Sequence, residues 1–122
     1  MKAYKYKNIN IDIYISQIEL REWYINETYN TITLYFTAPK EMLNNKYPEA
    51  EFMTISVEFP IDHQEACCAG VSCSPTRYIF EEDSYVDYDW FDMDISYEDV
   101  EKLFKKADET LTCFDYARGC EE

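Results

Sequence analysis

The sequence predicts an α+β domain in which an antiparallel sheet of about five to six strands packs against one C-terminal amphipathic helix. Two patterns support this: several short segments alternate apolar and polar residues, and the last long segment has helical apolar spacing. The 122 residues match the length of a single domain, 1–122, and no Gly- or Pro-rich linker divides them. With 12 tyrosines, 7 phenylalanines and 2 tryptophans, the chain has too many aromatic residues for an intrinsically disordered protein.

Four of the expected strands lie in the first half of the chain. The first, over about 9–15, places an isoleucine at every second position between polar residues. The second, over about 18–25, needs a bulge near Arg21 and Glu22 to keep its apolar residues on one face. Residues 27–30 have the composition of a hairpin turn, and 39–48 that of a loop or single helical turn. The remaining two strands are predicted over about 31–37 and 52–59.

The second half of the chain begins with residues 61–76, whose weak periodicity predicts an irregular connection. Further strands are expected over about 78–82 and 85–95, the latter with a bulge at Trp90 and Phe91 where the apolar parity changes. Ser96 is a good N-cap for a helix over about 97–111, since acidic residues follow it in the first turn. The apolar stripe that this helix would lay on the sheet consists of Val100, Leu103, Phe104, Ala107, Leu111 and Phe114.

Acidic residues outnumber basic residues by 25 to 11, which gives a formal net charge of −14. Proteins that bind nucleic acid directly need a basic footprint for the phosphates, so this class is excluded. The charge is also uneven. Residues 1–60 carry 8 acids and 6 bases, net −2, whereas residues 61–122 carry 17 acids and 5 bases, net −12. We therefore expect one strongly acidic side.

The densest acidic segment runs from Glu81 to Glu101 and holds ten acids, with no lysine or arginine, in 21 residues. Carboxylates at every second position of a strand lie about 6.6–6.8 Å apart, similar to the spacing of phosphates along a nucleic-acid strand. Like charges placed in this way repel each other, so we expect a partner outside the fold to account for them. The predicted bulge would place four aspartates on one solvent face: Asp87, Asp89, Asp92 and Asp94.

Two interpretations of this segment stay open: a solvated face that only raises solubility, and a surface that attracts a cationic partner. The absence of interleaved cations favours the partner, because single-sign fields mainly steer charged molecules. Tyrosines point the same way, since they are enriched in binding surfaces, although AT-rich coding would also raise their number. The predicted partner-binding residues are Glu81, Glu82, Asp83, Tyr85, Asp87, Tyr88, Asp89, Trp90, Asp92, Asp94, Glu98 and Asp99.

The remaining motifs predict no catalytic residue, metal site or cofactor. His63-Gln64-Glu65 before two cysteines lacks the second half of the zinc deaminase signature, and a Cys–His nucleophile would lack an oxyanion segment. The acidic segment has no glycine for a calcium loop and no lysine or histidine for magnesium-dependent nuclease chemistry. The cysteines lack the spacing of zinc knuckles, so we expect them to be small buried residues, or one pair to join the cysteine loop to the C-terminal tail. The loop holds Cys67, Cys68 and Cys73, and the tail holds Cys113 and Cys120.

The N-terminal segment is basic, but no apolar run of signal-peptide length follows it. No stretch approaches the roughly 20 apolar residues that a membrane-spanning helix needs. An odd number of cysteines is also unusual for a disulfide-stapled secreted domain. A cytoplasmic protein is therefore expected.

The segment Glu81-Glu82-Asp83, the run YVDYDWFDMDISYED, the small size and the uneven charge resemble the small acidic inhibitor proteins of phages and mobile elements. These include anti-CRISPR proteins and other DNA mimics, and the resemblance covers about the last third of the chain. It implies a non-enzymatic inhibitor that blocks a basic nucleic-acid-binding protein, such as a CRISPR effector or another nuclease, in the cytoplasm of a bacterial host. Because DNA mimics share no common fold, it implies no particular architecture and no set of functional residues.

An immunity or antitoxin protein that neutralises a basic nuclease toxin is the alternative hypothesis. Its electrostatics would be the same, and the neighbouring genes would distinguish the two. An enzyme would lose its activity on a single Cys or His substitution, and a plain accessory domain would change only its solubility when the acids are neutralised. Neither hypothesis predicts a direct contact with nucleic acid or membrane.

Overall fold

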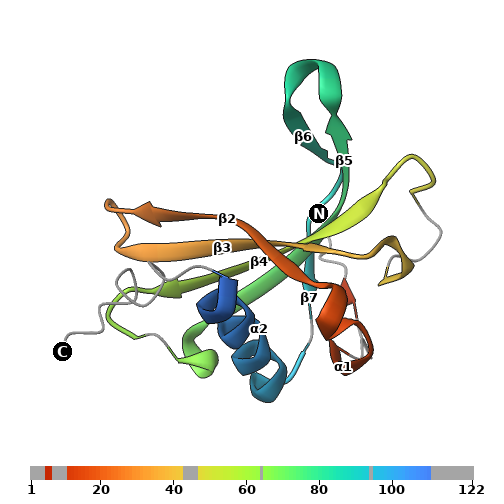
Figure 1. The fold of residues 1–122 in the computed structure, drawn as a ribbon. Helices are drawn as coiled ribbons and strands as arrows, with labels where there is room; N and C mark the ends of the chain where they lie inside the picture. Colours follow the sequence, from red (N-terminus) through yellow and green to blue (C-terminus); the bar gives the residue numbers. More distant parts are fainter. Residues whose placement is uncertain (1–4, 7–10, 43–46, 64, 94, 111–122) are drawn as a thin grey trace.

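The computed structural model describes residues 5–6, 11–42, 47–63, 65–93 and 95–110 (Figure 1). Within these residues a seven-stranded sheet has the order β1-β7-β5-β4-β3-β2, and β6 also pairs with β5. All pairs are antiparallel except that of β1 with β7, so the α+β class is confirmed. The strands are β1 (Lys5–Tyr6), β2 (Glu19–Asn26), β3 (Thr31–Ala38), β4 (Phe52–Pro60), β5 (Gly70–Ile79), β6 (Ser84–Asp87) and β7 (Phe91–Met93).

Strands β2 to β5 form a meander in which neighbours in sequence are neighbours in space. The predicted bulge is confirmed, because the register of β2 against β3 shifts between Leu20 and Glu22. The predicted turn at 27–30 is also confirmed: the Tyr29 amide donates to Asn26 Oδ1, and Asn30 has a positive φ of 57°. Asparagine tolerates this left-handed backbone better than most residues, which explains its place at the end of the turn.

The period-two pattern gives the sheet two different faces. One face carries the fully buried residues of β3 and β4, for example Phe36 and Ile55, and forms the core together with α1 (Ile11–Tyr14) and α2 (Tyr97–Thr110). Both helices lie on this side of the sheet in Figure 1. We call the opposite side the outer face. Its residues on β3, β4 and β5 are mainly hydroxylated or aromatic: Thr31, Thr33, Tyr35, Thr37, Phe52, Thr54, Ser56, Ser72, Ser74, Thr76 and Tyr78.

Helix α2 confirms the sequence-based prediction closely. The Asp99 amide donates to Ser96 Oγ at 3.1 Å, so Ser96 caps the helix, and Phe104 packs edge-on against Phe59 with ring centroids 5.0 Å apart. Val100, Leu103, Phe104 and Ala107 are all buried, whereas Leu111 and Phe114 lie outside the described residues. No helix in the described part of the chain is long and apolar enough to cross a membrane.

The strand predicted over 9–15 is wrong for residues 11–15, and residues 9 and 10 lie outside the described residues. Residues 11–14 form α1, and residues 15–17 continue as a 3₁₀ turn, η1 (Ile15–Gln17). Ile11 and Ile18 are buried with Ile15 packed between them, whereas Ile13 is 62% exposed. Spacings of four and three residues between inward side chains are helical. A row of isoleucines at every second position contains the spacing of four as well as that of a strand, and Ile18 adds the spacing of three.

The irregular connection predicted over 61–76 is wrong in its second half, because β5 begins at Gly70. A short 3₁₀ turn, η3 (Ala66–Cys68), precedes it. Pro75 lies inside β5 without interrupting the ladder. The Pro75 carbonyl accepts from the Tyr88 amide, and the backbone nitrogen of a strand residue points to the same side as its carbonyl. On that side residues 88–90 lie between the ends of β6 and β7, so the ladder needs no hydrogen-bond donor from Pro75. This position explains how a proline fits a central strand.

The strands predicted over 78–82 and 85–95 also differ from the structure. Residues 80–82 form a 3₁₀ turn, η4 (Phe80–Glu82), followed by Asp83 with a positive φ of 49°. After this turn β6 pairs with the second half of β5, and β7 pairs with its first half. The apolar parity changes near Trp90 because residues 88–90 cross from β6 to β7. The bulge predicted at Trp90 and Phe91 within a single strand is therefore wrong. We call residues 76–87 the hairpin arm; it projects from the sheet in Figure 1.

Candidate binding surface

The structure distributes the predicted partner-binding residues over three places. Glu81, Glu82 and Asp83 form the tip of the hairpin arm, residues 85–92 run from β6 through the crossing to β7, and Glu98 and Asp99 lie in the first turn of α2. The four predicted aspartates do not form one row on a single strand. Asp87 and Asp92 share the outer face, because they pair with Thr76 and Ser72, whose side chains lie on that face, but they belong to different strands. Asp94 lies outside the described residues.

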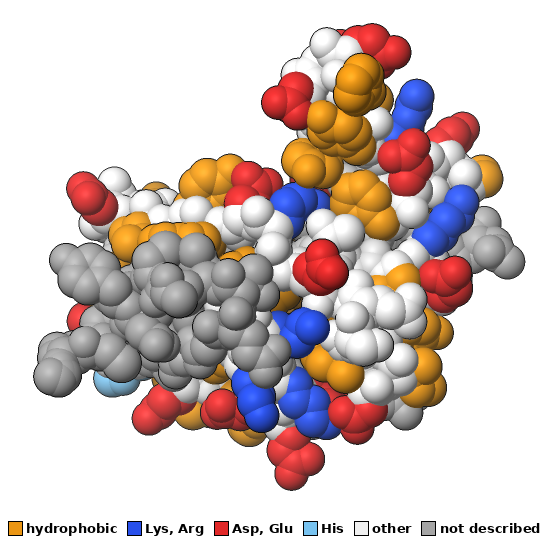
Figure 2. Space-filling view, in the orientation of Figure 1, with side chains coloured by type: hydrophobic (Ala, Val, Ile, Leu, Met, Phe, Trp, Pro, Cys, Tyr) orange, Lys and Arg blue, Asp and Glu red, His pale blue; other side chains and the backbone are white. Residues whose placement is uncertain are grey.

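The tip combines carboxylates with an apolar side chain. Glu81, Glu82 and Asp83 are exposed, and Phe80 beside them is 81% exposed. The Tyr78 hydroxyl donates to Asp83 Oδ1, and this hydrogen bond is the largest cause of a raised Tyr78 pKa. Figure 2 shows acidic and hydrophobic side chains together over the arm at the top of the view. An exposed apolar residue among acids is typical of a binding surface more than of a solubilising face.

Aromatic side chains connect the tip to the sheet. The ring centroids of Phe80 and Tyr78 are 6.5 Å apart, those of Tyr78 and Tyr85 are 5.2 Å apart, and those of Tyr85 and Phe52 are 6.0 Å apart. This series runs from the tip to β4 along one side of the arm. Offset and edge-to-face ring pairs of this kind add stability beyond their buried area. They stiffen a hairpin that would otherwise have few neighbours.

Arg21 on β2 reaches across the outer face and holds the base of the arm. Its Cζ atom lies 4.1 Å from the centroid of the Tyr85 ring and 5.8 Å from that of Phe52. Its side chain is only 13% exposed, and its Nε atom is 3.3 Å from Glu22 Oε2. A largely desolvated guanidinium over a tyrosine face is a strong form of cation–π contact. The β2 bulge is what directs this side chain across the outer face.

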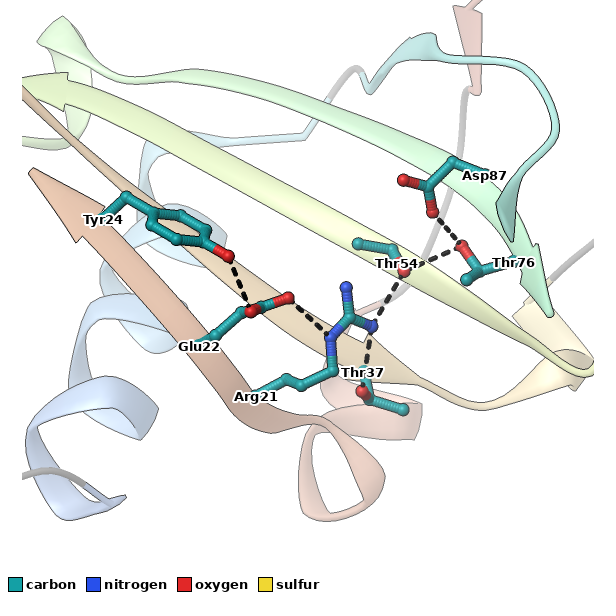
Figure 3. Close-up of polar contacts among 7 residues, drawn as sticks. All are labelled: Arg21, Glu22, Tyr24, Thr37, Thr54, Thr76 and Asp87. Atoms are coloured by element: carbon teal, nitrogen blue, oxygen red, sulfur yellow. Dashed lines mark hydrogen bonds and ion pairs between the residues drawn. The ribbon is translucent and has the colours of Figure 1, made fainter. Parts of the chain in front are cut away.

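A chain of hydrogen bonds joins the same arginine to Asp87 (Figure 3). Arg21 Nη1 donates to Thr54 Oγ1 at 3.1 Å, the Thr54 and Thr76 hydroxyl oxygens are 2.8 Å apart, and Thr76 donates to Asp87 Oδ1 at 2.8 Å. The Ser74 carbonyl, 3.0 Å from Thr76 Oγ1, is a second acceptor for the Thr76 proton. When Thr76 donates to Asp87, which only accepts, Thr54 donates to Thr76. Both threonines are fully buried. The chain thus connects a cation on β2 to an anion on β6 through β4 and β5.

Tyrosines surround this network and respond to its charges. The Tyr24 hydroxyl donates to Glu22 Oε1 at 2.8 Å, which raises the Tyr24 pKa (Figure 3). Burial is the main cause of a raised pKa at Tyr35, and the negative charge of Asp87 adds to it. Trp90 lies with its ring 6.4 Å from Tyr35 and is 45% exposed. Indole and phenol groups are therefore available on the outer face between the acidic residues.

Asp89 and Tyr88 lie at the edge of the sheet beside Tyr47. The Tyr47 hydroxyl donates to Asp89 Oδ2, and this hydrogen bond raises the pKa of Tyr47 to about 12. The Tyr47 ring stacks on Tyr88 with centroids 6.0 Å apart, and it also contacts the buried ring of Phe91. Asp89 thus fixes an aromatic cluster at the edge of the core in addition to adding negative charge there.

The acids at the start of α2 have a different environment. Asp99 Oδ1 lies 3.4 Å from Lys102 Nζ, and the same ammonium group pairs with Asp12 Oδ1. Both aspartates raise the pKa of Lys102, chiefly through the hydrogen bond with Asp12. Glu98 is exposed. Because a lysine compensates part of this charge, the start of α2 is a weaker candidate for binding a cationic partner than the hairpin arm.

Sequence reasoning missed Arg21, Glu22, Thr54 and Thr76 as members of this surface. The β2 bulge was the only sequence signal near them, and it did not show which strands would face the arginine. Cys67 and Cys68 are exposed in η3, whereas Cys73 is buried under the sheet, and burial raises its pKa to about 12. The burial expected for the cysteines is thus confirmed at Cys73 and wrong for this pair; Cys113 and Cys120 lie outside the described residues.

Comparison of the chain with protein-family models, with curated protein sequences and with solved structures gives no match.

Proposed function

We propose that the protein is a non-enzymatic inhibitor that uses the hairpin arm and the neighbouring acidic, tyrosine-rich outer face to block a basic nucleic-acid-binding protein. It acts in the cytoplasm of a bacterial host, in the manner of anti-CRISPR proteins and other DNA mimics. The observation that carries the proposal is the tip of the arm, where exposed Phe80 is followed by three exposed acidic residues on a hairpin that projects from the sheet.

Such a hairpin fits a groove lined by lysine and arginine, where nucleic acid normally lies. Glu81, Glu82 and Asp83 would occupy the phosphate-binding positions, and Phe80 would fill an apolar site between them. The net charge of −14 adds long-range attraction to a basic partner. Because the aspartates form no regular row, the geometry favours insertion of an acidic arm over imitation of evenly spaced phosphates.

The arm is also held ready for binding. Arg21 and the buried threonines connect its base to β2 and β4, and the aromatic series connects its tip to the sheet. A binding element that is ordered before the encounter loses less conformational entropy on association. Asp87 belongs to this internal network, so its replacement would disturb the arm as well as the charge.

The proposal is tested by measuring DNA cleavage by purified CRISPR effectors and other basic nucleases with the wild-type protein and two charge-reversed variants. E81K/E82K changes the tip, and E27K/E101K makes the same charge change at exposed positions in the β2–β3 turn and on α2. We expect E81K/E82K to raise the inhibitory concentration by at least about tenfold, since opposed charges would become like charges. E27K/E101K should change it much less.

Two further measurements make the result decisive. Inhibition should weaken as the salt concentration rises, because many ion pairs form at once, and added DNA should compete with the inhibitor for the nuclease. Equal loss in the two variants would show that only overall charge matters and would refute a role for the arm. If the inhibited nuclease is a toxin encoded beside this gene, the protein is an immunity protein or antitoxin.

A further inference from the structure

We propose that Glu65, Cys67 and Cys68 form a binding site for one thiophilic divalent metal ion, for which zinc is the best match. One carboxylate oxygen and two thiol sulfurs from these residues all lie within 4.8 Å of one another. The site lies at the opposite end of β5 from the hairpin arm. It is independent of the proposed inhibition, and either proposal can fail without the other.

The separations of the three ligand atoms fit a tetrahedral zinc ion. Zinc bonds of about 2.3 Å to sulfur and about 2.1 Å to oxygen place two sulfurs about 3.8 Å apart, and a sulfur and an oxygen about 3.6 Å apart. In the structure the two Sγ atoms are 3.9 Å apart, and Cys67 Sγ is 3.8 Å from Glu65 Oε1. The third pair, Cys68 Sγ and a Glu65 carboxylate oxygen, lies within 4.8 Å, and rotation of these exposed side chains would complete the geometry.

The backbone already brings the ligands together. In η3 the Cys68 amide donates to the Glu65 carbonyl at 2.9 Å, and the Ala69 amide donates to the Ala66 carbonyl at 3.2 Å. Ala66 is only 5% exposed and belongs to the core, so it anchors the turn while both thiols stay at the surface. The metal would therefore bind a turn that is ordered by the fold, with little entropy lost in arranging the ligands.

A divalent ion would also balance the charge of the three ligands. Two thiolates and a carboxylate would repel each other without a cation between them. A divalent ion removes this repulsion and displaces the thiol protons, so its affinity should rise with pH.

The donor set also selects the kind of metal. Thiolates favour soft or borderline ions such as zinc, whereas calcium and magnesium require oxygen ligands. Three protein ligands leave one tetrahedral position for water or an external ligand, unlike the closed sites of zinc knuckles. The site uses one glutamate and only two of the five cysteines, and these two are adjacent, so it does not have the cysteine spacing of a zinc knuckle.

Titration of the full-length protein with Co²⁺, in a phosphine reductant that does not chelate metals, tests the proposal. We expect one cobalt ion per chain with sulfur-to-cobalt charge-transfer absorption, and the loss of this absorption on addition of equimolar Zn²⁺. C67S/C68S should lose the absorption completely. E65Q should lower the cobalt affinity by at least about tenfold. Replacing a residue that only hydrogen-bonds to a metal ligand typically causes at least that loss.

Two controls separate this site from others in the chain. E41Q removes a carboxylate from another 3₁₀ turn, η2 (Lys40–Met42), and should bind cobalt like the wild type. C113S/C120S should also keep the absorption. The proposal is overturned if the wild-type protein shows no sulfur-to-cobalt absorption, if the absorption survives in C67S/C68S, or if C113S/C120S abolishes it. Circular dichroism of each variant verifies that it is folded.

Discussion

Arg21 on β2 lies over the ring of Tyr85 on β6, with its Cζ atom 4.1 Å from the ring centroid, although three strands separate them in the sheet. The contact ties the base of the hairpin arm to the far side of the outer face. It also explains how a hairpin with an acidic tip can project from the sheet and remain ordered.

Replacing Arg21 by lysine should loosen the arm. Lysine keeps the charge but lacks the planar group that contacts Thr37, Thr54 and the Tyr85 ring together. We expect faster amide hydrogen exchange in β6 and a decrease in the free energy of unfolding of about 1–2 kcal/mol. R77K, at an exposed position on the same hairpin, is the control. Similar exchange rates in the two variants would contradict the role assigned to Arg21.

Replacing Thr54 by valine should interrupt the hydrogen-bond chain while leaving the side-chain shape nearly unchanged. The buried Thr76 hydroxyl would lose a partner, and so would Arg21. We expect the free energy of unfolding, measured in urea, to fall by about 1–3 kcal/mol. T33V changes a threonine on the outer face of β3, and its free energy of unfolding should stay within about 0.5 kcal/mol of the wild-type value. A loss in T33V as large as in T54V would mean that the chain contributes nothing specific.

Stability should decline at high pH because of Tyr47. Its hydrogen bond to Asp89 raises its pKa in the folded protein to about 12, from an ordinary value of 10.0. As the pH rises from about 10 to about 12, the unfolded chain releases this proton and the folded protein retains it. The stability that the Tyr47–Asp89 hydrogen bond contributes is therefore fully present below about pH 10 and is lost as the pH rises to about 12.

Urea denaturation at several alkaline pH values measures this effect. Y47F should show a shallower decline than the wild type over this range, whereas Y29F, at an exposed tyrosine, should follow the wild type. If Y47F and the wild type lose stability in parallel, the hydrogen bond to Asp89 does not control the titration.

Replacing Ser96 by alanine should destabilise α2. The Ser96 hydroxyl accepts from the Asp99 amide, and without it this amide has no side-chain cap at the start of the helix. We expect the free energy of unfolding to fall by about 1 kcal/mol. S16A, an exposed serine in η1, serves as the control in the same denaturation experiment. An unchanged midpoint for S96A would show that α2 is held by its buried stripe alone.

The elements predicted correctly are those whose pattern of apolar residues fits only one type of secondary structure. In β3, four apolar residues alternate with threonines and a tyrosine, and only a strand can bury them all on one side. The stripe from Val100 to Ala107 likewise fits only a helix. The isoleucines of 9–15 fitted both periods, and the core selected the helix by leaving Ile13 in solvent. In β5 the small side chains of Ser72, Ser74 and Thr76 hid the strand pattern.

From the sequence alone it follows that the protein is acidic, that the acids concentrate after residue 60, and that a two-faced sheet carries a capped helix. These properties follow from composition and from local periodicity, which act over a few residues. The tertiary structure alone decided which acids form an exposed tip and which take part in internal contacts. Arg21, Thr54 and Asp87 come from three distant segments, and only strand pairing and twist align their side chains. Such alignment depends on distances in space that no local pattern records.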